Sequence, residues 1–417
     1  MNEAVPAPPS FRQALRFWGW LGCVSFGGPA GQIAILHREL VEKRKWIAEE
    51  RFQHALNYCL LLPGPEAQQL ATYCGWLMHG VRGGLAAGLL FILPSLFLLL
   101  FLSWLYLLFA AQPVVASLLW AVKPVVVALV LAAAWRLGGK VLKSWSAGLL
   151  AVSSFVALAF LQAPFPLIIL AAGLIGFLQR NPPPSESGTD AASRSLPLRR
   201  LGLLLMAGIL LGLGLYFLLL LTSPALAEMA AFFTRCALVC FGGAYAVLPY
   251  VQQASVEQYQ WLSSAQMLDG LALGESTPGP LIMIVTFVGF LGGWQKEMAG
   301  PGALLSGGLA GGLVATFFTF LPSFLFIFVG APLIEATRRQ PRLQGPLAAI
   351  GAAVIGVIIH LAWVFAGQVF APASGFDLPA LLLAVAAAWV LIAWEWSTLR
   401  VLGLALILGG LRFVALG

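Results

Sequence analysis

Two kinds of triplet interrupt apolar stretches of this chain, and both can expose backbone amides. Phe-Gly-Gly occurs at residues 26–28 and 241–243, and Pro-Gly-Pro occurs at residues 63–65 and 278–280. Proline lacks an N–H and clashes with the preceding turn, so a Pro-Gly-Pro triplet cannot continue an ordinary helix. A helix that begins inside a membrane points free N–H groups and a positive dipole end into the bilayer, where they bind anions without a buried lysine or arginine. Glycine lets the anion approach the backbone closely.

Neutral polar side chains near the triplets complete a candidate site for a tetrahedral dianion. Gln32, Gln68, Gln69 and Thr277 offer donors without a fixed charge, which suit an anion that must also leave the site. The alternative is that the glycines and prolines only kink helices and allow close packing. The candidate substrate-binding residues are Ser25, Gly27, Gly28, Pro29, Gln32, Pro63, Gly64, Pro65, Gln69, Lys123, Gly242, Gly243, Thr277, Pro278, Gly279 and Pro280.

Four charged residues lie in or beside apolar stretches, where a charge needs either a partner within the protein or a function in transport. Lys123 falls near the middle of the stretch 113–135. Inserting a charged side chain there costs roughly 2.5–3.5 kcal/mol of free energy. Lys123 is therefore expected either to be a counter-ion for the substrate or to form an ion pair with an acid such as Glu66 or Glu275. Glu66, Asp269 and Glu275 flank the Pro-Gly-Pro triplets and are the candidates for carrying a coupling proton. The alternative for each is a polar side chain whose hydrogen bonds are satisfied within the protein.

The triplets belong to an internal repeat. Residues 17–65 align with residues 232–280 without a gap, and the identical pairs include both Phe-Gly-Gly triplets, one tryptophan and both Pro-Gly-Pro triplets. Further along, Pro94-Ser95 pairs with Pro322-Ser323, and the extra residues of the second copy fall around 292–308, where a longer turn is expected. Apolar composition alone does not produce these matches in register, so the pattern indicates a duplication.

Composition places the repeats in a membrane. Of 417 residues, 60% are apolar and 9% are charged, and the mean hydropathy is +0.92. Soluble domains have about 45–50% apolar and about 25% charged residues. The net charge of +7 does not indicate nucleic-acid binding, because the basic residues lie in short loops between apolar stretches, which is the pattern of membrane topology.

The expected fold class is an all-α integral membrane protein with two inverted-topology repeats and broken or re-entrant helices. The expected domains are an N-terminal repeat at 1–180, a polar linker and connecting helix at 181–224, and a C-terminal repeat at 225–417. An odd number of crossings separates the starts of the two copies, which inverts the second copy. Re-entrant segments are favoured because they place the basic loops 37–51 and 136–143 on the cytoplasmic side. The apolar stretches are 15–36, 52–80, 83–111, 113–135, 144–162, 164–179, 200–222, 225–250, 265–294, 301–335, 345–370, 379–394 and 397–416.

The motifs of several other protein classes are missing from the sequence. It contains no GxxxxGK[ST] loop for ATP, no GxGxxG dinucleotide fingerprint and no metal-ligand cluster of His and Cys. No catalytic constellation is evident either. We therefore expect neither an enzyme nor a bound cofactor, and no redox chemistry on the substrate.

The two repeats together resemble the chromate ion transporter family, in its long two-domain form. The resemblance rests on the order of Ser-Phe-Gly-Gly-Pro, Trp and Pro-Gly-Pro in the first half and on the run from Cys240 to Leu281 in the second. The second half departs at Gly242-Gly243-Ala244, where no proline follows, so the two half-sites are not equivalent. The residues carried over by motif match are Ser25, Phe26, Gly27, Gly28, Pro29, Gln32, Glu39, Trp46, Pro63, Gly64, Pro65 and Gln69.

The resemblance implies a multi-pass carrier of the bacterial inner membrane that exports chromate and confers chromate resistance. Its partners would be chromate or a sulfate-like oxyanion and the lipid bilayer, with a homodimer as the expected assembly. A carrier for sulfate or another oxyanion is the alternative within the same class. An isoprenoid-phosphate lipid flippase is the alternative from another class, because re-entrant inverted repeats also suit a phosphate headgroup that enters from the side.

Overall fold

The computed structural model describes residues 9–26, 28–178, 198–241, 243–336, 344–372 and 375–416. Within these ranges the chain is entirely helices and turns, without a strand, as the predicted all-α fold class requires. Gly27, Gly242 and most of the predicted linker lie outside the described residues. The helices of the first half are α1 (Phe11–Val24), α2 (Gly28–His37), η1 (Arg38–Lys43), α3 (Glu49–Leu61), α4 (Glu66–Phe109), α5 (Pro113–Val141), α6 (Trp145–Leu161) and α7 (Phe165–Leu178).

The helix α8 (Leu198–Thr222) connects the two halves. Only 6% of its apolar window is buried, so its side chains face outward along most of its length. The helices of the second half are α9 (Pro224–Val239), α10 (Ala244–Gln253), η2 (Ala254–Gln258), α11 (Ser264–Ser276), η3 (Leu281–Met283), α12 (Ile284–Gln295), α13 (Leu304–Ala336), α14 (Gln344–Phe370), α15 (Leu378–Ala393) and α16 (Thr398–Leu416).

The 44-residue helix α4 is a hairpin of two helices rather than one straight rod. His79 and Gly80 have non-helical backbone angles, and a Cβ placed on Gly75 would lie 2.9 Å from the carbonyl carbon of Gly83. Residues eight apart in a straight helix are about 12 Å apart along its axis. The chain therefore reverses at residues 79–80, and small residues let the two limbs touch.

The second half contains the same hairpin with a longer turn. Gly289 of α12 lies against Gly311 and Ala315 of α13, as Gly75 lies against Gly83 and Ala87 in α4. The turn between α12 and α13 covers residues 296–303, within the region where the repeat predicted an insertion.

Six described helices are long and apolar enough to cross a membrane, and they include α4, α5, α8, α13, α14 and α16. The predicted stretches 144–162 and 164–179 form α6 and α7, with 17 and 14 residues. At 1.5 Å per residue these helices are shorter than the hydrocarbon core of about 30 Å. A turn that contains the left-handed cap Gln162 instead joins α6 and α7 as a short hairpin.

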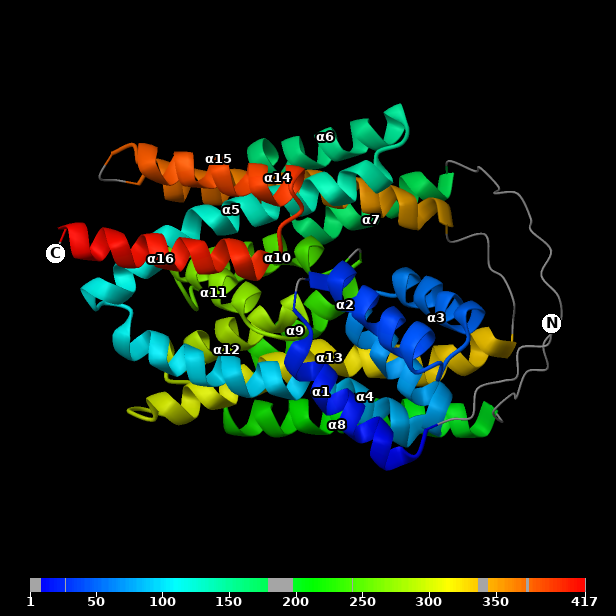
Figure 1. Cartoon of the computed structure of the whole chain (residues 1–417). Helices are drawn as coiled ribbons and strands as arrows, with labels where there is room; N and C mark the ends of the chain where they lie inside the picture. Colours follow the sequence, from blue (N-terminus) through cyan, green and yellow to red (C-terminus); the bar gives the residue numbers. More distant parts are fainter. Residues whose placement is uncertain are drawn as a thin grey trace.

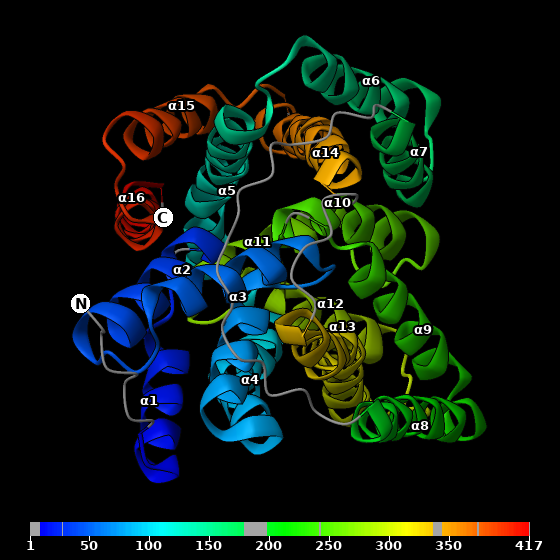
Figure 2. The same cartoon turned by 90° about the vertical axis from the view of Figure 1, so that its right-hand side faces the viewer.

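Helices from both halves mix in two layers. Figure 1 shows α5, α6, α7, α14, α15 and α16 on one side and α1, α4, α8, α12 and α13 on the other, and Figure 2 shows the same division along the bundle. In one layer α14 packs against α5, α6 and α7, and in the other α13 packs against α4, α8, α9 and α12. The helices α2, α10 and α11 lie between the layers, next to three of the four breaks, and the fourth break lies between α3 and α4.

Candidate functional site

The four breaks meet between the layers and are joined by hydrogen bonds that cross from one half to the other. The N–H of Gly64 donates to the carbonyl of Cys240 at 2.7 Å, and the N–H of Gly279 donates to the carbonyl of Ser25 at 2.7 Å. The repeat alignment pairs Gly64 with Gly279 and Ser25 with Cys240, so the two bonds are counterparts of each other. Each Pro-Gly-Pro turn is thus fixed to the Phe-Gly-Gly break of the opposite half.

The glycines at the breaks have backbone angles that other residues rarely adopt. Gly28 and Gly243 have φ of +72° and +90°, and Gly64 and Gly279 have φ of +126° and +111°. Gly64 and Gly279 are also closely surrounded, because a Cβ there would lie 2.5 Å from Ser323 Oγ and 2.7 Å from Ser95 Cβ, respectively. These two positions therefore require glycine for both conformation and space.

Each break is followed by a new helix whose first amides lack partners within that helix. Pro65 caps α4 and Pro280 caps η3, each with an extended backbone, while Pro63 and Pro278 open the two turns. In the first half Pro29 is the second residue of α2, whereas in the second half Ala244 opens α10. The starts of α2, α4, α10 and η3 therefore bring several positive helix ends to one region.

Two of the predicted neutral donors, Gln32 and Gln69, bond to the backbone of the breaks, whereas Gln68 donates to Thr72 Oγ1 within α4 at 3.0 Å. Gln32 Nε2 donates to the carbonyls of Ser25 at 3.2 Å and Gly279 at 2.5 Å, and Gln69 Nε2 donates to the carbonyl of Pro63 at 2.8 Å. Ser25 Oγ donates to the carbonyl of Leu21, and Thr277 Oγ1 donates to that of Gly274 at 2.9 Å. Gln32 and Gln69 therefore hold the turns in shape, and the N–H groups of Gly64 and Gly279 are themselves bonded across the two halves.

Lys123 of α5 forms an ion pair with Asp269 of α11, not with the glutamates considered from the sequence. Lys123 Nζ lies 3.2 Å from Asp269 Oδ1, and Tyr106 of α4 donates to Asp269 Oδ2 at 2.9 Å. The Asp269 side chain is 5% exposed and that of Lys123 is 26% exposed. Asp269 thus links a helix of one layer to a helix of the other.

The two glutamates lie closer to the breaks. Glu275, near the end of α11, accepts a hydrogen bond from the hydroxyl of Tyr245 in α10. Glu66 is the first residue of α4, and its Oε1 lies 3.7 Å from the position of a Cβ on Gly243. Both carboxyl groups therefore lie beside the converging helix starts.

Two basic residues that the sequence predicted in the loop 136–143, Arg136 and Lys140, instead belong to α5, which continues to Val141. Arg136 donates from Nη2 to the carbonyl of Leu391 in the last turn of α15 at 2.8 Å. A guanidinium at that position suits the negative end of a helix. Arg136 and Lys140 lie on the last turns of α5, where Lys140 interacts electrostatically with Glu66. Their position just after the apolar stretch 113–135 indicated that they lie at the membrane boundary, because basic residues flank the membrane core.

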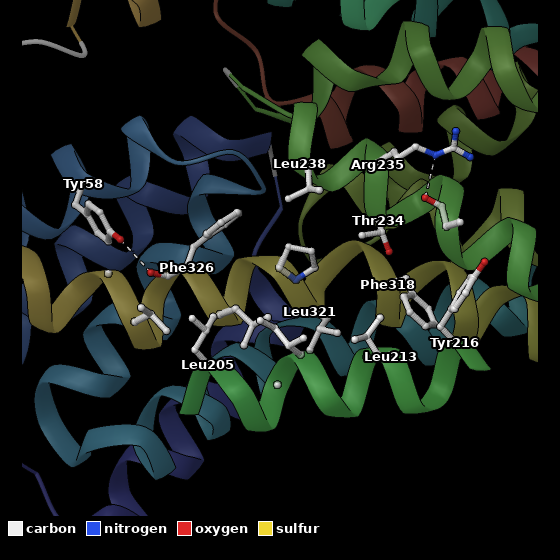
Figure 3. Close-up of a pocket in the computed structure, with 18 residues that line it drawn as sticks. Tyr58, Leu205, Leu213, Tyr216, Thr234, Arg235, Leu238, Phe318, Leu321 and Phe326 are labelled. Atoms are coloured by element: carbon white, nitrogen blue, oxygen red, sulfur yellow. Dashed lines mark hydrogen bonds between the residues drawn. The ribbon is translucent and has the colours of Figure 1, made fainter. Parts of the chain in front are cut away.

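A groove of about 640 Å³ lies between α8, α9 and α13, and Figure 3 shows the side chains that line it. Leucines, phenylalanines and glycines line most of it, and the hydroxyl of Tyr58 donates to the carbonyl of Phe326 at 3.0 Å. Arg235 bonds to the carbonyl of Ala231. The Arg235 guanidinium also donates to the hydroxyl of Tyr259 at 3.3 Å, and the rest of the lining is largely apolar, so the groove suits an apolar group better than an oxyanion. In the part of the chain that the structure describes, no group of three or more His, Cys, Asp or Glu residues could hold a metal ion.

Comparisons with known proteins agree with the two-copy organisation. The family model described as chromate transporter matches residues 12–177 and again residues 227–411. A chromate transport protein of Pseudomonas aeruginosa is 32% identical over 404 residues, which cover 93% of this chain and 90% of that protein. A chromate transport protein of Cupriavidus metallidurans is 29% identical over 399 residues, which cover 94% and 91%. An uncharacterized transporter of Bacillus subtilis, YwrB, is 32% identical over 152 residues, which cover 36% of this chain and 77% of that relative. No solved structure matches the chain.

Proposed function

Because this chain belongs to the chromate transporter family, we propose that it is a secondary carrier that exports chromate across the bacterial inner membrane and so confers resistance. It is a multi-pass membrane protein of helices, and the absence of an ATP-binding loop from its sequence favours a carrier driven by an ion or charge gradient. The substrate assignment rests on the family and on relatives named as chromate transport proteins.

The observation that carries this proposal is the convergence of the four helix breaks. Backbone amides at the starts of α2, α4, α10 and η3 supply dipoles and donors for a doubly negative solute. Ser25, Gly27, Gly28, Pro29, Gly242, Gly243 and the two Pro-Gly-Pro turns form the proposed site, with Gln32, Gln69 and Thr277 as its support. Neutral donors bind the dianion without holding it as tightly as a buried cation would.

We propose that the halves at 1–180 and 225–417, joined through 181–224, are inverted copies that expose the site to each side in turn. The reciprocal bonds of Gly64 and Gly279 support a two-fold relation between the breaks. In Figure 1 the turn at 142–144 lies at one end of the bundle and the turns at 110–112 and 296–303 lie at the other. The end at 142–144 carries Lys140 and Lys143 and is assigned to the cytoplasm.

Glu66 and Glu275 are the proposed carriers of a coupling proton. Both lie beside the helix starts, where protonation would change the charge that the anion meets. Asp269 was an equal candidate from its sequence position, but Lys123 and Tyr106 already engage it. We also propose that the protein forms a homodimer. Light scattering of the detergent-solubilised protein tests this assembly.

The test of the proposed function is transport by the purified protein in lipid vesicles. We expect vesicles to take up labelled chromate when a proton gradient is imposed, and uncoupling should abolish the uptake. Sulfate in excess is the competitor that distinguishes a chromate carrier from a general oxyanion carrier. Movement of an isoprenoid phosphate, without transport of chromate or sulfate, would refute the carrier proposal in favour of a flippase.

A further inference from the structure

Two buried serines that follow a proline in a long helix have hydroxyl groups without a partner. Ser95 follows Pro94 in α4, and Ser323 follows Pro322 in α13. Each serine is 1% exposed, and neither Oγ atom has a hydrogen-bond partner among the described residues. The repeat alignment pairs the two serines, so the same unusual state occurs in both halves.

Both hydroxyls lie against the Pro-Gly-Pro turn of the opposite half. A Cβ on Gly279 would be 2.7 Å from Ser95 Cβ and 3.1 Å from Ser95 Oγ. A Cβ on Gly64 would be 2.5 Å from Ser323 Oγ. Ser95 of the first half therefore touches the second-half turn, and Ser323 of the second half touches the first-half turn. This places both hydroxyls next to the amides of the converging breaks.

Neighbouring hydroxyls in the same helices behave differently. Ser103 Oγ in α4 donates to the carbonyl of Leu99 at 2.6 Å, and Thr319 Oγ1 in α13 donates to the carbonyl of Ala315 at 2.7 Å. This bond to the carbonyl four residues earlier is the usual way for a helix to satisfy a buried hydroxyl. A buried hydroxyl without any partner is unfavourable, and in native proteins it calls for a specific explanation.

We propose that Ser95 and Ser323 each donate a hydrogen bond to an oxygen of the transported oxyanion, one hydroxyl from each half. A tetrahedral oxyanion presents acceptors in several directions, so it can receive a hydroxyl together with amides of the neighbouring helix starts. The assignment rests on the proposed function, and it adds two side-chain donors to a site otherwise built from backbone. It also explains why the predicted glutamine donors can remain bonded to the turns.

The test compares Ser95→Ala and Ser323→Ala with Ser103→Ala and Thr319→Val, which remove hydroxyls of the same helices that are already bonded. Chromate uptake into vesicles is measured against chromate concentration, and thermal unfolding is measured in detergent. We expect each test variant to raise KM at least about tenfold, which corresponds to about 1.4 kcal/mol. We expect the control variants to keep the wild-type KM.

Protein stability is a second readout, in which the control variants and not the test variants are expected to be impaired. Removing an unpartnered hydroxyl should leave Ser95→Ala and Ser323→Ala at least as stable as the wild type, whereas the controls lose a hydrogen bond and should unfold at a lower temperature. Test variants with the KM of the controls, or with lower stability than the controls, would overturn the assignment while leaving the carrier proposal intact. A wild-type protein that transports neither chromate nor sulfate would overturn the carrier proposal and this assignment with it.

Discussion

The buried ion pair between Lys123 and Asp269 gives the sharpest prediction about stability. Replacing Lys123 with methionine leaves the Asp269 carboxylate, 5% exposed, with only the hydroxyl of Tyr106 as a partner. Replacing Asp269 with asparagine leaves Lys123, whose side chain is 26% exposed and therefore closer to polar surroundings. We expect Lys123→Met to be the more damaging change, and Lys123→Met/Asp269→Asn to recover most of the loss.

The magnitude follows from the separation and the burial. Two unit charges 3.2 Å apart attract by about 5 kcal/mol at an effective dielectric constant of about 20. Desolvation costs several kcal/mol per ion, so the intact pair contributes little net stability. Removing one partner of such a pair costs about 3–5 kcal/mol, because the other charge stays buried and unpaired. The double variant removes both charges, and the new amide at position 269 would still accept the bond from Tyr106, so we expect a coupling energy of about 2–3 kcal/mol.

Thermal and chemical unfolding of the purified protein in detergent measure these differences. Lys143→Met is the matched control, because Lys143 is an exposed lysine just beyond the end of the same helix and its loss should change the free energy of unfolding by less than about 0.5 kcal/mol. Equal stability of the single and double variants would refute the ion pair. We also expect the double variant to transport chromate, since Asp269 already neutralises Lys123. A stable double variant without transport would show that one of the two contacts the substrate.

Three further predictions concern the turns and the loops. Gly302→Ala, in the turn between α12 and α13, should cost about 1–2 kcal/mol of stability and keep chromate uptake, because φ there is +74° and no atom lies within 4 Å of the added Cβ, whereas Gly64→Ala should stop uptake because Ser323 and Gln69 block that Cβ; equal uptake by both variants would contradict this. The hydrogen bond from Lys43 is the main cause that lowers the pKa of Glu39 in the loop below its usual 4.5, so the unfolded chain binds the extra proton first and this contribution to stability is lost as the pH falls below about 4.5; Lys43→Met should lower the stability at neutral pH and make its fall below about pH 4.5 shallower, and an unchanged pH profile would refute it. Arg136→Gln should lower the unfolding temperature, because its charged hydrogen bond to the end of α15 contributes about 1.5–3 kcal/mol, and an unchanged temperature would show that the bond is dispensable.

The breaks and the repeat were predictable because they are local signals. A Pro-Gly-Pro triplet has one physical consequence wherever it falls in a helix, and identical triplets in register identify two copies. The convergence of the breaks was expected from the duplication, and the bonds of Gly64 and Gly279 join each turn to the opposite half. The side-chain pairings could not be predicted in this way. They depend on which turns of different helices face each other, and a single sequence does not contain that information.

Lys123 illustrates that limit. Its burial and its need for an acid could be predicted from its position, but Asp269 lies on a helix of the other half, and three acids met the same criterion. The glutamine donors show a second limit, because a free amide group and one that supports a turn have the same sequence signature. The length of α6 and α7 shows a third, because an apolar stretch of marginal length can span or turn back.

Pro29 and Ala244 occupy the same position in the two copies, and only alanine supplies an N–H there. One hydrogen bond to a charged group contributes about 1.5–3 kcal/mol, so an anion held by the start of α10 is bound roughly ten- to a hundredfold more tightly than one held by the start of α2. Such a difference cannot change the final concentration ratio across the membrane, which the driving gradient sets. If the anion depends more on α10 in one state of the transport cycle and more on α2 in the other, it would leave faster from the second state, and a single proline would make the rates of the two half-cycles unequal.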